Sequence, residues 1–176
     1  MKITALEEYG LRCMMQLALA PDDRPMTVAQ VAEREGLSTE YAGKLLNLLG
    51  QADLVQSVRG RNGGFVLGRP TDQITVASIV RALSTNLFDS EFCTRHSGAA
   101  DVCVHQTNCA LRPVWSTVSE IINHTLDRIT LRDLIGSERQ VSDDLQSRAK
   151  ATPLRIGVGG SSRIFPLSEV RGSEAG

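Results

Sequence analysis

The sequence has 176 residues, of which 41% are hydrophobic and 4% aromatic, with a net charge of -1. The length allows one compact domain plus a tail, because domains commonly hold about 100–200 residues. The composition predicts an aliphatic, mainly helical core. Near-neutrality excludes a non-specific polycation, so any nucleic-acid surface must be a local basic patch.

No run of residues approaches the ~18–20 uninterrupted apolar residues that cross a bilayer. Glu7 and Glu8 stand where a signal peptide would need an apolar region. We therefore expect a cytoplasmic protein without a membrane partner. Its four cysteines then face a reducing compartment, where clustered thiols more often bind metal or do redox chemistry than form structural disulfides.

The N-terminal elements predict a helix-turn-helix. Apolar residues recur at helical spacing over 5–20. Thr27 then caps a short helix that Gly36 ends, and Ser38 caps a second helix that reaches about Leu49. Two short helices joined by a tight Gly-Leu-Ser turn are typical of this motif.

A basic hairpin follows at once. Two predicted strands, about 54–58 and 65–67, flank the turn Arg-Gly-Arg-Asn-Gly-Gly at 59–64. This order is the winged-helix arrangement, so we assign residues 1–86 to a winged helix-turn-helix DNA-binding domain. The fold class we predict is mainly α with a small β-hairpin, in which this domain is followed by a long dimerisation helix.

The second helix and the wing carry the predicted DNA contacts. A helix in the major groove needs polar side chains on its outward face, and a wing needs positive charge on backbone that can approach phosphates. Residues 37–70 hold four basic and two acidic side chains, so this segment is locally basic. The alternative, solvated charges on a winged helix that contacts protein, is less favoured by this combination. The residues predicted to contact DNA are Thr39, Glu40, Tyr41, Gly43, Lys44, Asn47, Arg59, Arg61, Gly63 and Gly64.

The C-terminal half predicts a helix, a loop and a longer helix. Thr75 caps a helix with an apolar stripe, and a polar loop follows over 87–110. Pro113 fits the first turn of a long amphipathic helix, and a short helix from about Leu131 closes the segment 111–136. Residues 137–176 are rich in Ser, Gly and Arg without sustained periodicity, which predicts a mostly disordered tail.

Three cysteines give the loop its chemistry. Nine residues separate Cys93 from Cys103, and five separate Cys103 from Cys109. Structural zinc sites usually pair ligands ~2–4 residues apart, whereas wider spacing suits a loop around an iron–sulfur cluster, which thiolates bind. His105 lies between two of these cysteines and is a candidate ligand. Cys13 falls on the apolar stripe of the first helix, so we place it in the core.

The chain resembles the dimeric winged-helix iron–sulfur transcription regulators that include IscR, NsrR and RirA. The resemblance is carried by the Met-Lys-Ile-Thr start with Glu8 and Tyr9, by the Val-Arg-Gly-Arg-Asn-Gly-Gly-Phe wing at 58–65, and by the cysteine loop running into Leu-Arg-Pro-Val-Trp at 111–115. It covers the chain except the tail after Ser137.

The resemblance implies a homodimer held by the helices after Pro113. Each subunit would bind a 2Fe–2S or 4Fe–4S cluster through the three loop cysteines. In some members the fourth ligand is an acidic residue from the first helix of the partner subunit, and Glu8 matches that place, with His105 as the alternative. In IscR-like members it is a histidine three residues past the last cysteine, where this chain has Arg112.

We therefore expect a transcription regulator, a repressor in preference to an activator, that binds a double-stranded DNA operator under control of a cluster. The cluster would sense redox state, nitric oxide or iron and cluster status. The alternative keeps the DNA reader and gives the cysteines a thiol switch or zinc. A small metal or redox enzyme is least favoured, because the sequence has no Gly-rich nucleotide loop, no Cys-x-x-Cys pair and no paired carboxylate motif.

Overall fold

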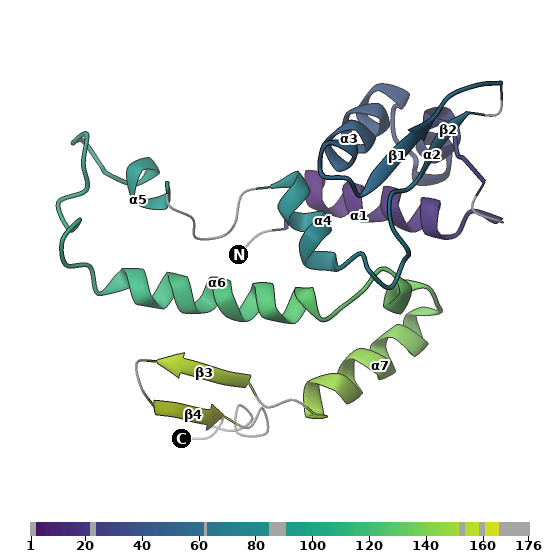
Figure 1. Ribbon diagram of the computed structural model, residues 1–176. Coiled ribbons are helices and arrows are strands. Elements are labelled where there is room, and N and C mark those ends of the chain that lie inside the picture. Colours follow the sequence, from purple (N-terminus) through teal and green to yellow (C-terminus); the bar gives the residue numbers. More distant parts are fainter. Residues whose placement is uncertain are drawn as a thin grey trace, which may run out of the picture. The chain divides into compact units, whose positions relative to one another are not determined.

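The computed structural model describes residues 3–21, 24–61, 63–84, 91–151, 154–158 and 161–165 (Figure 1). Outside these described ranges lie the first two residues, Asn62 of the wing, and residues 87–90 at the start of the cysteine loop. The chain divides into two compact units, Met1–Ile135 and Gly136–Gly176. Each is described by itself.

Three helices begin the first unit: α1 (Ala5–Ala18), α2 (Val28–Glu35) and α3 (Thr39–Gln51). Each starts at a hydroxyl cap: Thr4, Thr27 and Ser38 accept hydrogen bonds from backbone N–H groups of the first turns. Gly36 ends α2 with φ +64°, a conformation that favours glycine. The predicted caps and the tight turn between α2 and α3 are confirmed.

The wing is the antiparallel hairpin of β1 (Val55–Val58) and β2 (Gly64–Leu67), with Val55 opposite Leu67 and Val58 opposite Gly64. A bridge between Met26 and Phe65 attaches the hairpin to the segment before α2. The prediction of a mainly α fold with a small β-hairpin is confirmed.

The core of this unit is aliphatic and lies among α1, α2, α3, the hairpin and α4 (Val76–Leu83). Gly10 allows α1 to approach α4, because a Cβ atom there would collide with Leu83. We call this part, residues 3–84, the winged-helix domain. Its largest fully buried side chains are Met14, Leu45, Leu46, Leu49, Leu54, Ile74 and Ile79, joined by Leu131 from beyond α6.

The cysteine loop contains α5 (Phe92–Arg95) and runs into α6 (Leu111–Asp127). Pro113 lies in the first turn of α6, as predicted. The predicted closing helix is a single 3-10 turn, η2 (Arg132–Leu134). Among the described residues, no helix is both long enough and apolar enough to cross a membrane.

The second unit holds α7 (Glu138–Ala151) and an antiparallel hairpin of β3 (Leu154–Val158) and β4 (Ser161–Phe165). This differs from the prediction of a mostly disordered tail after Ser137. The helix starts at a reciprocal pair: Ser137 N–H donates to Gln140 (2.9 Å), and Gln140 N–H donates to the Ser137 hydroxyl (3.4 Å). Because α7 is polar on most of its faces, apolar periodicity gave no sign of it.

Candidate nucleic-acid interface and cysteine loop

The outward face of α3 is polar and accessible. Its buried residues are Ala42, Leu45, Leu46 and Leu49, which lie in the core. The opposite side exposes four of the predicted DNA contacts, Thr39, Glu40, Lys44 and Asn47. A groove-reading helix needs this arrangement.

Two other predicted contacts on α3, Tyr41 and Gly43, lie partly covered by neighbouring helices. Tyr41 is half-buried, and its ring meets the Tyr9 ring of α1 edge to face, with 6.0 Å between centroids and 85° between planes. Gly43 is half-buried, and a Cβ there would lie 3.6 Å from Val28 Cγ1 of α2. Tyr41 therefore packs α3 against α1, and Gly43 lies within ordinary contact distance of α2, which a helical wheel of one segment does not show.

The wing presents two exposed arginines, Arg59 and Arg61, beside Gly60 at φ +121°. The other two glycines of the wing, Gly63 and Gly64, are explained by close contacts with the local backbone. A Cβ at Gly63 would collide with the carbonyl oxygen of Val58, and one at Gly64 with that of Met26. The wing's own backbone requires both glycines, whether or not DNA comes near them.

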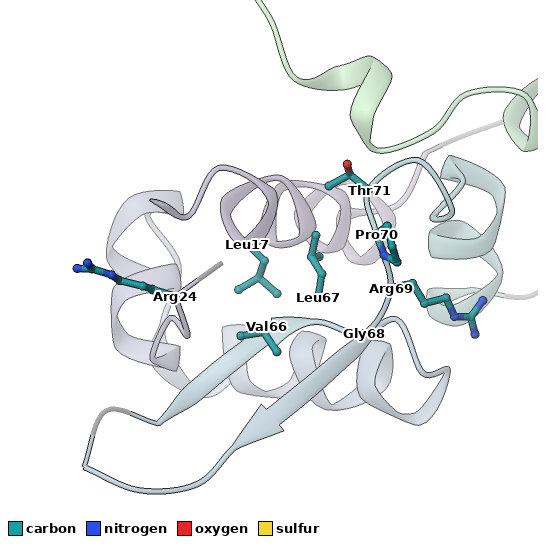
Figure 2. Close-up of a pocket in the computed structure, with 8 residues that line it drawn as sticks. All are labelled: Leu17, Arg24, Val66, Leu67, Gly68, Arg69, Pro70 and Thr71. Atoms are coloured by element: carbon teal, nitrogen blue, oxygen red, sulfur yellow. The ribbon is translucent and has the colours of Figure 1, made fainter. Parts of the chain in front are cut away.

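A cavity of about 540 Å³ opens between the end of α1 and the second wing strand (Figure 2). Leu17, Val66 and Leu67 point into the space between α1 and the hairpin, whereas Arg24 and Arg69 extend away from it on opposite sides. Because these two charged groups do not converge on the cavity, we assign it no ligand. Gly68, Pro70 and Thr71 complete the lining.

The three loop cysteines are free thiols and half-buried: Cys93 lies in α5, and Cys103 and Cys109 lie between α5 and α6. His105 is exposed. Within the described part of the chain, no three His, Cys, Asp or Glu side chains lie close enough together to hold a metal ion. The donors therefore fit an iron–sulfur cluster in kind, but this conformation does not gather them.

Cys13 differs from the loop cysteines. It is fully buried in the core, as predicted. Burial raises the pKa of its thiol to about 11, with a smaller contribution from the nearby Glu35 charge. At neutral pH it is a protonated, inert side chain.

Glu8 and Arg112, two of the positions that bear on a fourth ligand, lie on different elements. Glu8 is exposed on α1. Arg112 turns back to the loop and donates to the backbone carbonyl of Gln106 at 2.8 Å. Arg112 thus braces the loop backbone at the position where IscR-like members were expected to carry a histidine.

Two ion pairs within this unit were not indicated by the sequence. Arg12 of α1 pairs with Glu35 of α2, and Arg81 of α4 pairs with Asp127 of α6. The partners are 23 and 46 residues apart, so no local pattern relates them.

Comparison with known proteins gives a consistent result. The family model of Rrf2, described as iron-dependent transcriptional regulators, matches residues 3–137. The HTH-type transcriptional regulator IscR of Sodalis glossinidius (strain morsitans) is 32% identical over 159 residues, which cover 89% of this chain and 93% of that protein.

Two solved structures are similar over about three quarters of the chain. T. potens IscR is 34% identical, with a TM-score of 0.57, and the match covers 77% of this chain and 86% of that chain. CymR (YrzC), the global cysteine regulator of B. subtilis, is 31% identical, with a TM-score of 0.61 and coverage of 76% and 95%.

Proposed function

This chain belongs to the Rrf2 family of iron-dependent transcriptional regulators, and we propose that it is a dimeric repressor whose operator binding is controlled by an iron–sulfur cluster. Its relatives are transcriptional regulators, not enzymes. The observation that carries the proposal is the placement of three half-buried free thiols in one loop, in the same unit as a winged helix and running directly into α6.

DNA binding is assigned to the exposed residues of α3 and the wing. Lys44, Arg59 and Arg61 place positive charge on the recognition helix and the hairpin tip. In a two-fold dimer the two recognition helices would enter successive major grooves about one helical turn, ~34 Å, apart. The operator is therefore a two-fold symmetric double-stranded sequence.

The dimer is assigned to α6. Leu111, Val114 and Trp115 near its start are 62%, 51% and 41% exposed, and Ser119 is the only buried residue among those of this helix. An amphipathic helix with its apolar side chains this accessible requires a partner surface. A second copy supplies a self-complementary one about a two-fold axis.

The cluster is assigned to Cys93, Cys103 and Cys109, with Glu8 of the partner subunit as the fourth ligand and His105 as the alternative. When bound, the cluster would supply a centre that responds to oxidants, nitric oxide or iron supply. Binding at sites that are not preformed is coupled to ordering of the protein, so the thiols would close the loop at the start of α6. Arg112 braces that loop through Gln106.

Oxygen-free purification followed by visible absorption and iron and sulfide analysis tests this assignment. We expect a coloured protein, and we expect Ala at Cys93, Cys103 or Cys109 to abolish the colour. Cys13→Ala is the matched control and should keep it, because Cys13 is buried in the core. Colour lost in Cys13→Ala but kept in Cys103→Ala would overturn the ligand assignment.

A second candidate function is a thiol switch or zinc site in the same loop. The similarity to CymR, described as a global cysteine regulator, favours it. A colourless protein that contains zinc, or that forms a disulfide among the loop cysteines on oxidation, would establish it in place of the cluster.

A further inference from the structure

The chain after α6 is joined to the winged-helix domain by backbone pairing. Thr130 forms an antiparallel bridge with Thr75. Leu131 N–H donates to the Ile74 carbonyl at 2.7 Å, and Val76 N–H donates to the Ile129 carbonyl at 2.8 Å. This joint fixes where α6 leaves the domain.

An ion pair at the same joint fixes the direction in which α6 leaves. Arg81 of α4 donates two hydrogen bonds to Asp127, the last residue of α6, from Nη2 to Oδ1 (2.8 Å) and from Nη1 to Oδ2 (3.2 Å). Thr75, the N-cap of α4, also donates to Asp127 Oδ1 at 3.4 Å. The carboxylate is therefore held from the start and the later part of α4, and α4 packs on α1 and α3.

This pair is poorly placed to add stability. The Arg81 and Asp127 side chains are 42% and 44% exposed, and ion pairs this accessible contribute little to folding. A two-point guanidinium–carboxylate contact nevertheless restricts orientation strongly. This contact therefore controls the orientation of α6 against the winged-helix domain.

We propose that Arg81 and Asp127 are positioning residues that set the operator half-site spacing, an inference that rests on the dimer proposed above. A 17-residue helix is ~25 Å long, so a ~5° rotation at the joint moves its far end by ~2 Å. One inserted base pair separates the half-sites by a further ~3.4 Å and rotates them by ~35°. Shared between the two joints of the dimer, this change requires ~1.7 Å and ~17° at each joint. An intact two-point contact restricts such a rotation, so loosening the joint lets the dimer accept spacings that the intact joint rejects.

The test uses an operator selected from a random double-stranded library with the full-length wild-type protein. Affinities are measured for the selected operator, for versions with one base pair added or removed at the centre, and for a duplex with one half-site destroyed. We expect the wild type to prefer its own spacing by ~10-fold or more.

The variants are Asp127→Asn, which removes the charge, and Arg81→Lys, which keeps the charge but loses the planar fork. Both should reduce the preference to ~3-fold or less and leave binding to the single half-site unchanged. Asp72→Asn, in the exposed turn before α4, is the matched charge control and should keep the wild-type preference. Thermal melting of each variant confirms that it is folded.

Two outcomes would overturn the inference in different ways. A spacing preference unchanged in folded Asp127→Asn and Arg81→Lys refutes the positioning role and leaves the proposed function intact. A selected site without two-fold symmetry refutes the dimeric operator complex, and the positioning role with it.

Discussion

Arg12 of α1 and Glu35 at the end of α2 form an ion pair, with 2.5 Å between Arg12 Nε and Glu35 Oε2. The same carboxylate accepts a hydrogen bond from Gln16, and the Arg12 guanidinium lies 5.2 Å from the centre of the Tyr9 ring, which contacts Tyr41 of α3. One nearly buried carboxylate thus joins α2 to α1 directly, and α1 contacts α3 through the two tyrosine rings.

Glu35→Ala should destabilise the winged-helix domain. The Glu35 side chain is only 7% exposed. Its removal leaves Gln16 without this acceptor and leaves Arg12 with only the backbone carbonyl of residue 35. We expect a loss of about 1–3 kcal/mol in the free energy of unfolding, measured in urea. Glu33→Ala, on the exposed face of the same helix, is the control and should change stability by less than about 0.5 kcal/mol. Equal effects in the two variants would show that the Glu35 contacts are unimportant.

The stabilisation from Asp127 should disappear in acid. The hydrogen bond from Arg81 lowers the pKa of Asp127, although partial burial opposes the shift. A carboxylate with a lowered folded pKa stabilises the protein above its unfolded pKa, about 3.9 for aspartate, and loses this effect as pH falls through the folded value.

Asp127→Asn should therefore be less stable than the wild type at pH 7, by at most about 1 kcal/mol because both partners are half-exposed. The difference should shrink to nothing as pH falls through the lowered pKa of Asp127. Urea unfolding at pH 7 and at a series of acidic pH values measures it. A difference that grows in acid would contradict the assigned shift.

The four thiols should differ in reactivity. At pH 8 and without bound metal, iodoacetamide should modify the three loop cysteines, which are half-buried, much faster than Cys13. Cys13 is fully buried with a pKa of about 11, so its thiolate is scarce and inaccessible. Peptide mass analysis over time gives the rates. Modification of Cys13 as fast as that of Cys103 would contradict its place in the core.

The basic residues should separate into base-reading and phosphate-binding roles. Arg59→Ala should weaken operator binding by ~1–3 kcal/mol, because an arginine on the wing tip can enter a narrow groove.

Lys44→Ala should weaken binding to specific and to non-specific DNA about equally, and it should make the salt dependence of binding shallower by a slope of ~1. Fluorescence anisotropy across a salt series measures both. Operator binding at full strength by the Arg59/Arg61 double alanine variant would contradict DNA binding by the wing and would favour a role of the wing in contacting protein.

Local signals accounted for the elements of the winged-helix domain. Thr27, Ser38 and Gly36 specify helix ends through their own backbone and hydroxyl chemistry, so the sequence predicted them. The wing followed from the glycine-rich turn between two short apolar runs. Each of these features depends on residues only a few positions apart.

Tertiary contacts were harder to predict. Gly43 and Tyr41 look outward on an isolated helix, yet neighbouring helices cover part of each. Glu35 meets Arg12 across 23 residues, and no periodicity relates two charged side chains at that distance. The helix over 138–151 lacks an apolar stripe, so its caps and residue propensities were its only signals.

We propose that a cluster on the loop cysteines controls DNA binding. The most direct measurement compares operator affinity of the oxygen-free, iron- and sulfide-containing protein with that of the same protein after chelation, alongside Cys103→Ser. We predict that cluster loading changes the operator affinity of the wild type ~5–150-fold, which corresponds to a coupling of about 1–3 kcal/mol. The same treatment should leave the operator affinity of Cys103→Ser unchanged. Equal affinity of the loaded and stripped wild-type protein would contradict the account.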